Sequence, residues 1–168
     1  APANSPVIRL LFPLLTPSEL VSYLARRLGG SEPFPAAPDL WLDHWEAQLA
    51  RLQQEGRRPI VIIDDAQAID DPLVWQTLHL LLNYRHGDRP AFTLVLCGQP
   101  ELAGRLEHWP ALCERFAFLC GLTAFTEEET AGYVRQRLER SGAATDLFQE
   151  AALARIHELS GGLPRRIN

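Results

Sequence analysis

The feature that most constrains the fold is a set of short apolar runs that alternate with amphipathic segments. Residues 59–63 and 92–97 are rich in branched side chains and show no polar alternation, which is typical of strands buried on both faces of a sheet. Residues 7–12 form a third run, closed by Pro13. Strands that alternate with helices predict a parallel α/β sheet.

The segments between these runs carry helix signals. Thr16 and Glu19 form a capping box before an apolar stripe that ends at Leu28, and Asp71 followed by Pro72 predicts a second helix start. We expect further helices within residues 42–52, 101–106, 126–142 and 149–159, a loop at 31–38, a turn at 83–90 and a weaker strand at 116–120.

No strand signal follows residue 122, where the sequence becomes helical. A capping box at Thr126 and Glu129 opens this part. A sheet segment followed by helices alone predicts two parts. We place an α/β core at residues 1–122 and a small helical subdomain at 123–168.

Composition excludes several classes of protein. Sixteen Lys and Arg against 21 Asp and Glu leave a net charge of −5, which argues against a generally basic nucleic-acid binder. No apolar run approaches the roughly 20 residues of a membrane-spanning helix. Cys97, Cys113 and Cys120 match neither a disulfide framework nor a zinc motif, so we expect small core residues in a reduced, cytosolic protein.

Two adjacent carboxylates, Asp64 and Asp65, end the apolar run at 60–63. Ligands of open α/β sheets bind outside the carboxyl ends of strands. Asp64 is placed to hold Mg²⁺ through its water shell, and Asp65 to polarise an attacking water. The alternative is that both acids cap the following turn.

Three further polar residues suit a phosphate ligand. Gln99 ends the next apolar run, where an amide can orient water or touch a terminal phosphate. Arg115 is either a surface cation or a charge donor to a transferring phosphoryl group. Arg165 follows Pro164 in the first turn of a helix, a position that favours anions and therefore suggests a phosphate partner.

The order of these motifs, DDAQ after one strand, GQPEL after the next, then ER-F and SGGLPRRIN, resembles the AAA+ ATPases of the general secretion pathway protein A (ExeA-like) group, related to TniB-type transposition helpers. The resemblance covers residues 7–168 and is most specific at 60–67, Asn83, 98–102 and 160–168. It implies a P-loop NTPase fold, with a parallel sheet flanked by helices and a small helical lid, and it implies ATP and Mg²⁺ as cofactors.

The resemblance also implies a role for each polar residue. Asp64 corresponds to the Walker B magnesium ligand, Gln99 to the sensor 1 residue, Arg115 to an arginine finger acting on a neighbouring subunit, and Arg165 to the sensor 2 arginine. Asp65 stands where the family usually has the catalytic Glu. Its carboxylate is one methylene shorter, and a displacement of about 1 Å can cost roughly a hundredfold in rate.

One family element is missing from this sequence. No G-x-x-x-x-G-K-[ST] occurs, and Gly29 and Gly30 are followed by Ser31 and Glu32. In the family this loop and its strand precede the region that matches Val7, so the resemblance implies a phosphate-binding segment before this sequence. The absence of Met points the same way, and the lid is expected to be truncated.

A structural expectation follows, because the missing strand would lie between residues 92–97 and 116–120. We predict a three-stranded remnant in which 116–120 is displaced or poorly paired. We also expect this polypeptide alone to bind ATP poorly.

The leading hypothesis is a Mg²⁺-ATP-driven AAA+ module that forms a ring and remodels a secretion or cell-envelope assembly. It would be cytoplasmic, with any attachment to the inner face of the bacterial membrane made by parts outside this sequence. The alternatives are a nucleotide-responsive scaffold without turnover and a DNA-transaction helper of the transposition kind. The net charge of −5 counts against nucleic acid as the partner.

Overall fold

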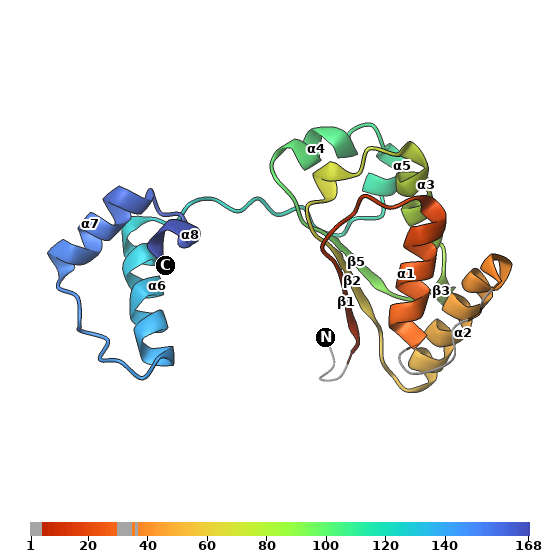
Figure 1. Cartoon of the computed structure of the whole chain (residues 1–168), viewed down its shortest axis with the longest axis horizontal. Helices are drawn as coiled ribbons and strands as arrows, with labels where there is room; N and C mark the ends of the chain where they lie inside the picture. The colour runs from red at the N-terminus through yellow and green to blue at the C-terminus, as the bar shows by residue number, and fades with distance from the viewer. Residues whose placement is uncertain (1–4, 30–34, 36) are drawn as a thin grey trace. The chain divides into compact units, whose positions relative to one another are not determined.

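A computed structural model describes residues 5–29, 35 and 37–168, and the chain divides into two compact units, Ala1–Phe118 and Leu119–Asn168 (Figure 1). Most of the loop expected at 31–38 lies outside the described residues. The first unit contains every strand that the structure describes, and the second contains helices only.

The first unit is built on a parallel sheet of three strands, as the sequence predicts. Strands β1 (Val7–Leu10), β2 (Ile60–Ile63) and β5 (Thr93–Leu96) lie in the order β1-β2-β5. Leu10 pairs with Ile63, and Ile63 pairs with Leu96. The carboxyl ends of the three strands therefore meet at one edge.

Helices cover one face of this sheet, on which α1, α2 and α3 can be followed in Figure 1. The two crossovers, β1 to β2 and β2 to β5, step in the same direction across the sheet. Because such crossovers are right-handed, their helices fall on the same face. The elements of this layer and of its connections are α1 (Pro17–Gly29), η1 (Pro38–Leu40), α2 (Trp41–Gln54), η2 (Ala66–Ala68), α3 (Pro72–Leu81), α4 (Glu101–Leu106) and α5 (Pro110–Cys113).

The core lies between this helical layer and the sheet. Its strand residues are Ile8, Leu10, Val61 and Ile63, each at most 4% exposed. Trp45 on α2 meets the ring of Phe92 edge-on at 5.4 Å between centroids. Both expected helix starts are confirmed by hydrogen bonds, from Thr16 N–H to Glu19 at 2.8 Å and from Leu73 N–H to Asp71 at 2.9 Å.

The opposite face of the sheet is open, which corrects the expectation of strands buried on both faces. Val7 is 51% exposed and Val95 37%, while Ile60 and Ile62 are only half-buried. Among the described residues, no crossover steps back across the sheet, so no helix is placed over this face. The sequence is apolar at these positions although the face is uncovered.

Residues 116–126 contain no helix or strand, and Phe118 and Leu119 are 91% and 84% exposed. The expected three-stranded remnant is therefore confirmed, whereas residues 116–120, which we expected as a weak and displaced or poorly paired strand, form no strand. Within the described chain, β5 has a neighbour on one side only. The turn expected at 83–90 contains a small antiparallel hairpin, β3 (Arg85–His86) with β4 (Arg89–Pro90).

The second unit packs three helices, α6 (Glu127–Arg140), α7 (Glu150–Ser160) and α8 (Pro164–Ile167). The capping box of Thr126 and Glu129 is present, with both hydrogen bonds formed. Between α6 and α7, the buried hydroxyl of Thr130 lies 3.0 Å from Nδ1 of His157. The small apolar core of this unit consists of Ala131, Val134 and Leu153.

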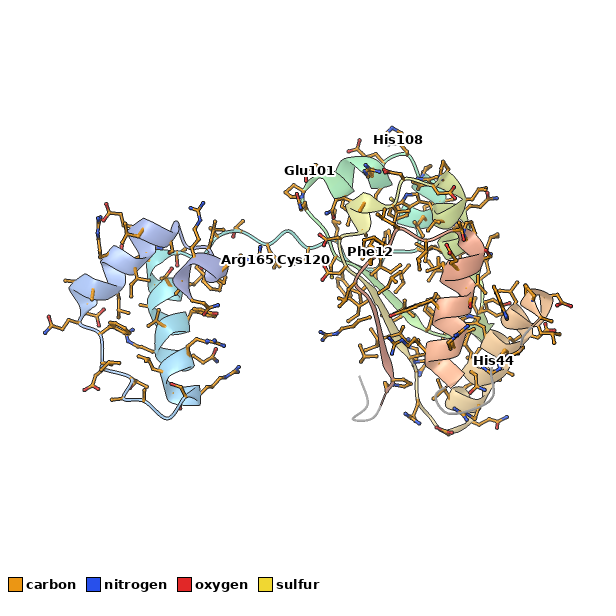
Figure 2. All side chains as sticks on the ribbon, viewed as in Figure 1. Phe12, His44, Glu101, His108, Cys120 and Arg165 are labelled. Carbon is orange, nitrogen blue, oxygen red and sulfur yellow. The ribbon has the colours of Figure 1, made fainter. Side chains whose placement is uncertain are left out.

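The cysteines do not all lie in the core, contrary to expectation. Only Cys113 is half-buried, while Cys97 and Cys120 are exposed. Cys97 follows the last residue of β5, and Cys120 lies in a segment without helix or strand (Figure 2). Cys97 thus follows a strand of the sheet whose open face has no covering helix in the described chain. Cys120 lies in the segment 116–120, where the expected strand is not formed.

Candidate functional site

The two adjacent carboxylates lie at the carboxyl edge of the sheet, as the sequence predicts. The Asp64 N–H donates to the Leu10 carbonyl at 2.9 Å, and the Ala66 N–H donates to the Cys97 carbonyl at 2.9 Å. The segment that carries both acids is thus fixed to the ends of β1 and β5, and both acidic residues are exposed.

Asp65 has an unusual backbone conformation. Its φ of 47° and ψ of 38° lie in the left-handed region, and it is the one non-glycine residue with positive φ in the described part of the chain. Asp tolerates this region better than most residues, and such positions are frequent at functional sites. Its side chain makes no capping hydrogen bond to η2, which counts against a capping role for this acid.

Gln67 joins the ends of β2 and β5, and the sequence interpretation assigned it no role. Its amide nitrogen donates to Oδ1 of Asp65 at 3.1 Å, and its amide oxygen accepts from the Gln99 N–H at 3.1 Å. The Gln67 side chain therefore connects Asp65 to the predicted sensor residue Gln99. Its place as the last residue of the DDAQ motif is the one feature of the sequence that indicated a role for it.

Gly98 permits this bridge because it has no side chain. A Cβ at this position would lie 2.4 Å from the amide oxygen of Gln67 and 3.0 Å from Cδ2 of Leu102. The GQ pair after β5 thus has a local reason: Gly98 leaves room for the Gln67 side chain, and the Gln99 N–H donates a hydrogen bond to it.

The structure brings Asp64, Asp65 and Gln99 to one edge but holds Arg115 elsewhere. The Arg115 guanidinium donates to Oδ1 of Asn83 at 2.9 Å, two residues after the end of α3. A helix of this length spans about 15 Å, and α3 begins near the acids. Asn83 is a second residue to which the sequence interpretation gave no role, although it belongs to one of the specific stretches.

Arg165 belongs to the second unit. It lies exposed in the first turn of α8 (Figure 2), which confirms the expected helix start at Pro164. Its role towards a phosphate stays a prediction.

The carboxylate edge suits Mg²⁺ in part. Within the described residues there is no group of three or more His, Cys, Asp or Glu that could hold a metal. Mg²⁺ is commonly bound by one or two carboxylates together with waters and substrate phosphates, and Asp64 and Asp65 can supply the carboxylates. The phosphate-binding loop G-x-x-x-x-G-K-[ST] requires a lysine. All 16 Lys and Arg residues of this sequence are Arg, so this loop is not part of it.

A comparison with models of protein families identifies the family of this chain. The profile described as "AAA domain" matches residues 2–106. The chain belongs to the AAA domain family. It is thus a module of the AAA+ ATPase class, as the motif order implied.

One curated protein and one solved structure are similar to this chain. General secretion pathway protein A of Aeromonas hydrophila is 36% identical over 132 residues, which are 77% of this chain and 23% of that protein. The structure of the Aeropyrum pernix ORC2 protein in its ADPNP-ADP complexes superposes with a TM-score of 0.66 at 21% identity, covering 92% of this chain and 41% of that one. The second likeness supports the fold, a parallel sheet with helices followed by a helical part.

This chain thus spans about a quarter of the length of the Aeromonas protein. Within its described residues, no helix is both long and apolar enough to cross a membrane.

Proposed function

We propose that this chain provides the Walker B and sensor residues of a Mg²⁺-dependent ATPase module. The observation that carries the proposal is the gathering of Asp64, Asp65 and Gln99 at one sheet edge, with Gln67 bonded to the last two. Parallel sheets bind ligands at this edge. The AAA family match supports the assignment.

Each residue at the edge has a distinct task in this proposal. Asp64 would hold the hydrated metal through its exposed carboxylate. The Asp65 N–H donates to Oδ1 of this carboxylate at 3.1 Å and so fixes its orientation. Asp65 would accept a hydrogen bond from the attacking water on Oδ2, the carboxylate oxygen to which Gln67 does not donate. Gln99, which is exposed after the end of β5, would supply an amide group to the terminal phosphate. The nucleotide, when bound, supplies the phosphoryl group that water attacks.

The phosphate cradle would come from a segment outside this sequence. In the part of the chain that the structure describes, β5 has a free edge that can accept one more parallel strand, and no helix covers the face that carries Val7, Ile60, Ile62 and Val95. A crossover that steps in the opposite direction places its helix on this face. Such a strand and helix would complete both the sheet and the phosphate site.

Arg115 and Arg165 act on the nucleotide from other parts of the assembly. Because Arg115 is held at the C-terminal end of α3, we assign it to the nucleotide of a neighbouring subunit in a ring. Arg165, on the helical lid, would contact the nucleotide of its own subunit. Charge neutralisation by arginine is a general element of phosphoryl transfer.

The work of the module would be remodelling of a secretion or cell-envelope assembly in the cytoplasm. The relative named General secretion pathway protein A supports this direction. A scaffold that binds nucleotide without turnover is the outcome expected if Asp65 is too short to act as the base.

The test uses the complete protein in which this sequence occurs, together with Mg²⁺ and ATP. Asp64→Ala should reduce turnover by about a hundredfold or more. Asp88→Ala is the matched control, because Asp88 is exposed in the hairpin and only its carbonyl is bonded, to Arg85. Equal turnover in wild type and Asp64→Ala would refute the assignment, and binding without turnover in the wild type would support the scaffold.

A further inference from the structure

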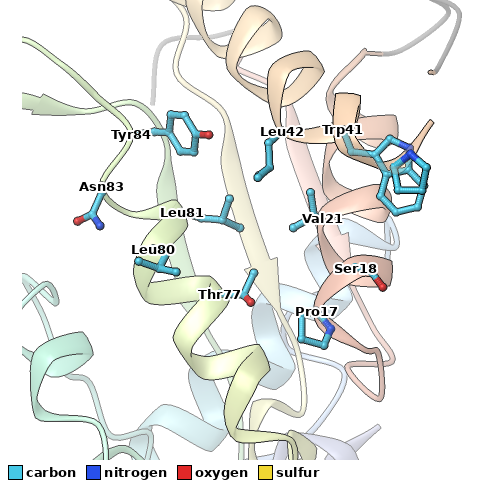
Figure 3. Close-up of a pocket in the computed structure, with 11 residues that line it drawn as sticks. Pro17, Ser18, Val21, Trp41, Leu42, Thr77, Leu80, Leu81, Asn83 and Tyr84 are labelled. Carbon is cyan, nitrogen blue, oxygen red and sulfur yellow. The ribbon is translucent and has the colours of Figure 1, made fainter. Parts of the chain in front are cut away.

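A groove of about 520 Å³ lies among α1, α2 and α3, on the face of the helical layer that points away from the sheet (Figure 3). Its walls come from the start of α1, the start of α2 and the end of α3. The side chains that form it are largely apolar and include Val21, Trp41, Leu42, Leu80 and Leu81. Of the residues that line the groove, the proposed ATPase uses only Asn83, which accepts the hydrogen bond from Arg115.

The apolar wall is unusually open to solvent. Leu80 is 55% exposed and Leu42 44% exposed, and both side chains line the groove (Figure 3). Contiguous exposed apolar surface that polar residues surround is characteristic of interaction sites. A groove between helices suits the apolar face of another helix, held by anchors at positions i, i+3 and i+7.

The rim of the groove on the α2 side is acidic. Asp43 and Glu46 are exposed on α2, where Asp43 is next to the groove residue Leu42 and Glu46 lies one helical turn after it. Burial raises the pKa of Tyr84, which also lines the groove, and the carboxylates of Glu46 and Asp43 raise it further. In the described part of the chain, neither Asp43 nor Glu46 forms an ion pair. Their charge is therefore available to a partner.

We propose that this groove binds an amphipathic helix of a partner protein, with apolar anchors on one face and Arg or Lys beside them. The anchors fill the space between Leu42 and Leu80, and the basic side chains reach Asp43 and Glu46. The apolar wall supplies affinity, and the acidic rim selects orientation and excludes acidic partners. This docking needs no nucleotide.

The test uses the whole chain and a synthetic, fluorescein-labelled amphipathic helix of about 15 residues, with Leu at i, i+3 and i+7 and Arg on the flanking positions. Fluorescence anisotropy gives its Kd. Leu80→Glu should raise the Kd about tenfold or more, because it places a charge among the anchors. Leu73→Glu is the matched control, since Leu73 is 58% exposed on the same helix but outside the groove.

A second pair of measurements tests the charge. Asp43→Asn with Glu46→Gln should raise the Kd about threefold and weaken its dependence on salt. A peptide with Glu in place of Arg should bind about tenfold more weakly than the basic one. The proposal is overturned if basic and acidic peptides bind equally, or if Leu73→Glu weakens binding as much as Leu80→Glu. It is also overturned if the protein alone dimerises and Leu80→Glu makes it monomeric.

Discussion

The Arg115 guanidinium donates a hydrogen bond to Oδ1 of Asn83, 2.9 Å away, and so ties the segment after α5 to the end of α3. This bond fixes the direction of an exposed arginine that the motif order assigns to a neighbouring subunit's nucleotide. Asn83 is therefore a positioning residue in the proposed ATPase, because it acts through Arg115.

Removal of this bond should lower turnover without preventing nucleotide binding. We expect Asn83→Ala in the complete protein to reduce kcat about tenfold, because a misdirected finger loses charge stabilisation in the transition state alone. The KM for ATP should change less than kcat. Asn83→Asp, which keeps an oxygen acceptor for Arg115, should restore most of the rate, and failure of this rescue would contradict the positioning role.

Replacement of Gly98 by alanine should break the bridge made by Gln67. A Cβ at residue 98 would lie 2.4 Å from the Gln67 amide oxygen, so the side chain must leave and the Gln99 N–H loses its acceptor. The expected cost is about 1 kcal/mol in the free energy of unfolding, measured by urea denaturation with tryptophan fluorescence. Gly104→Ala, within α4 and with nothing within 4 Å, should be neutral or stabilising.

The left-handed backbone of Asp65 predicts a difference between two substitutions that both remove its carboxylate. Asp65→Gly should be more stable than Asp65→Ala by about 0.5–1 kcal/mol, because alanine pays a steric cost at positive φ that exceeds the extra freedom of unfolded glycine. Urea denaturation of the two variants measures the difference directly. Equal stabilities would mean that φ at this residue is not 47° in solution.

The capping box at the start of α1 predicts a change of stability with pH. Hydrogen bonds from the backbone and side chain of Thr16 hold the pKa of Glu19 below its ordinary value of 4.5. The carboxylate therefore stabilises the folded state fully above pH 4.5, and this contribution disappears as the pH falls through the lowered pKa.

Glu19→Gln isolates this contribution, since glutamine keeps the capping geometry without the charge. The melting temperature of the wild type should exceed that of Glu19→Gln at pH 6, and the difference should shrink towards pH 3. A difference that stays constant over this range would contradict the assignment.

Much of the fold could be predicted from sequence because its signals are local. The capping boxes at Thr16 and Thr126 need only residues three positions apart, and both formed as expected. Asp64 and Asp65 follow a strand directly, so parallel pairing alone carries them to the sheet edge. The resemblance in motif order also placed a missing strand beside β5, and the described chain has a free edge there.

The network within the site could not be predicted, because it depends on side chains from separate loops. Gln67 meets the Gln99 N–H across 32 residues, and Arg115 meets Asn83 across the same separation. No periodicity or capping rule specifies such contacts. The first contact follows from the approach of η2 to the loop after β5, and the second from the approach of the segment after α5 to the end of α3.

The sequence by itself determined the strands, the helix starts and the two acids at the sheet edge, because periodicity, capping and strand ends are properties of neighbouring residues. Only the tertiary structure decided that one face of the sheet is uncovered, since both right-handed crossovers step in the same direction. An apolar run such as 60–63 is the same whether one face or two are covered. Whether a face of the sheet is covered thus depends on the order in which the strands are connected, and the hydrophobic pattern of a single strand does not contain that information.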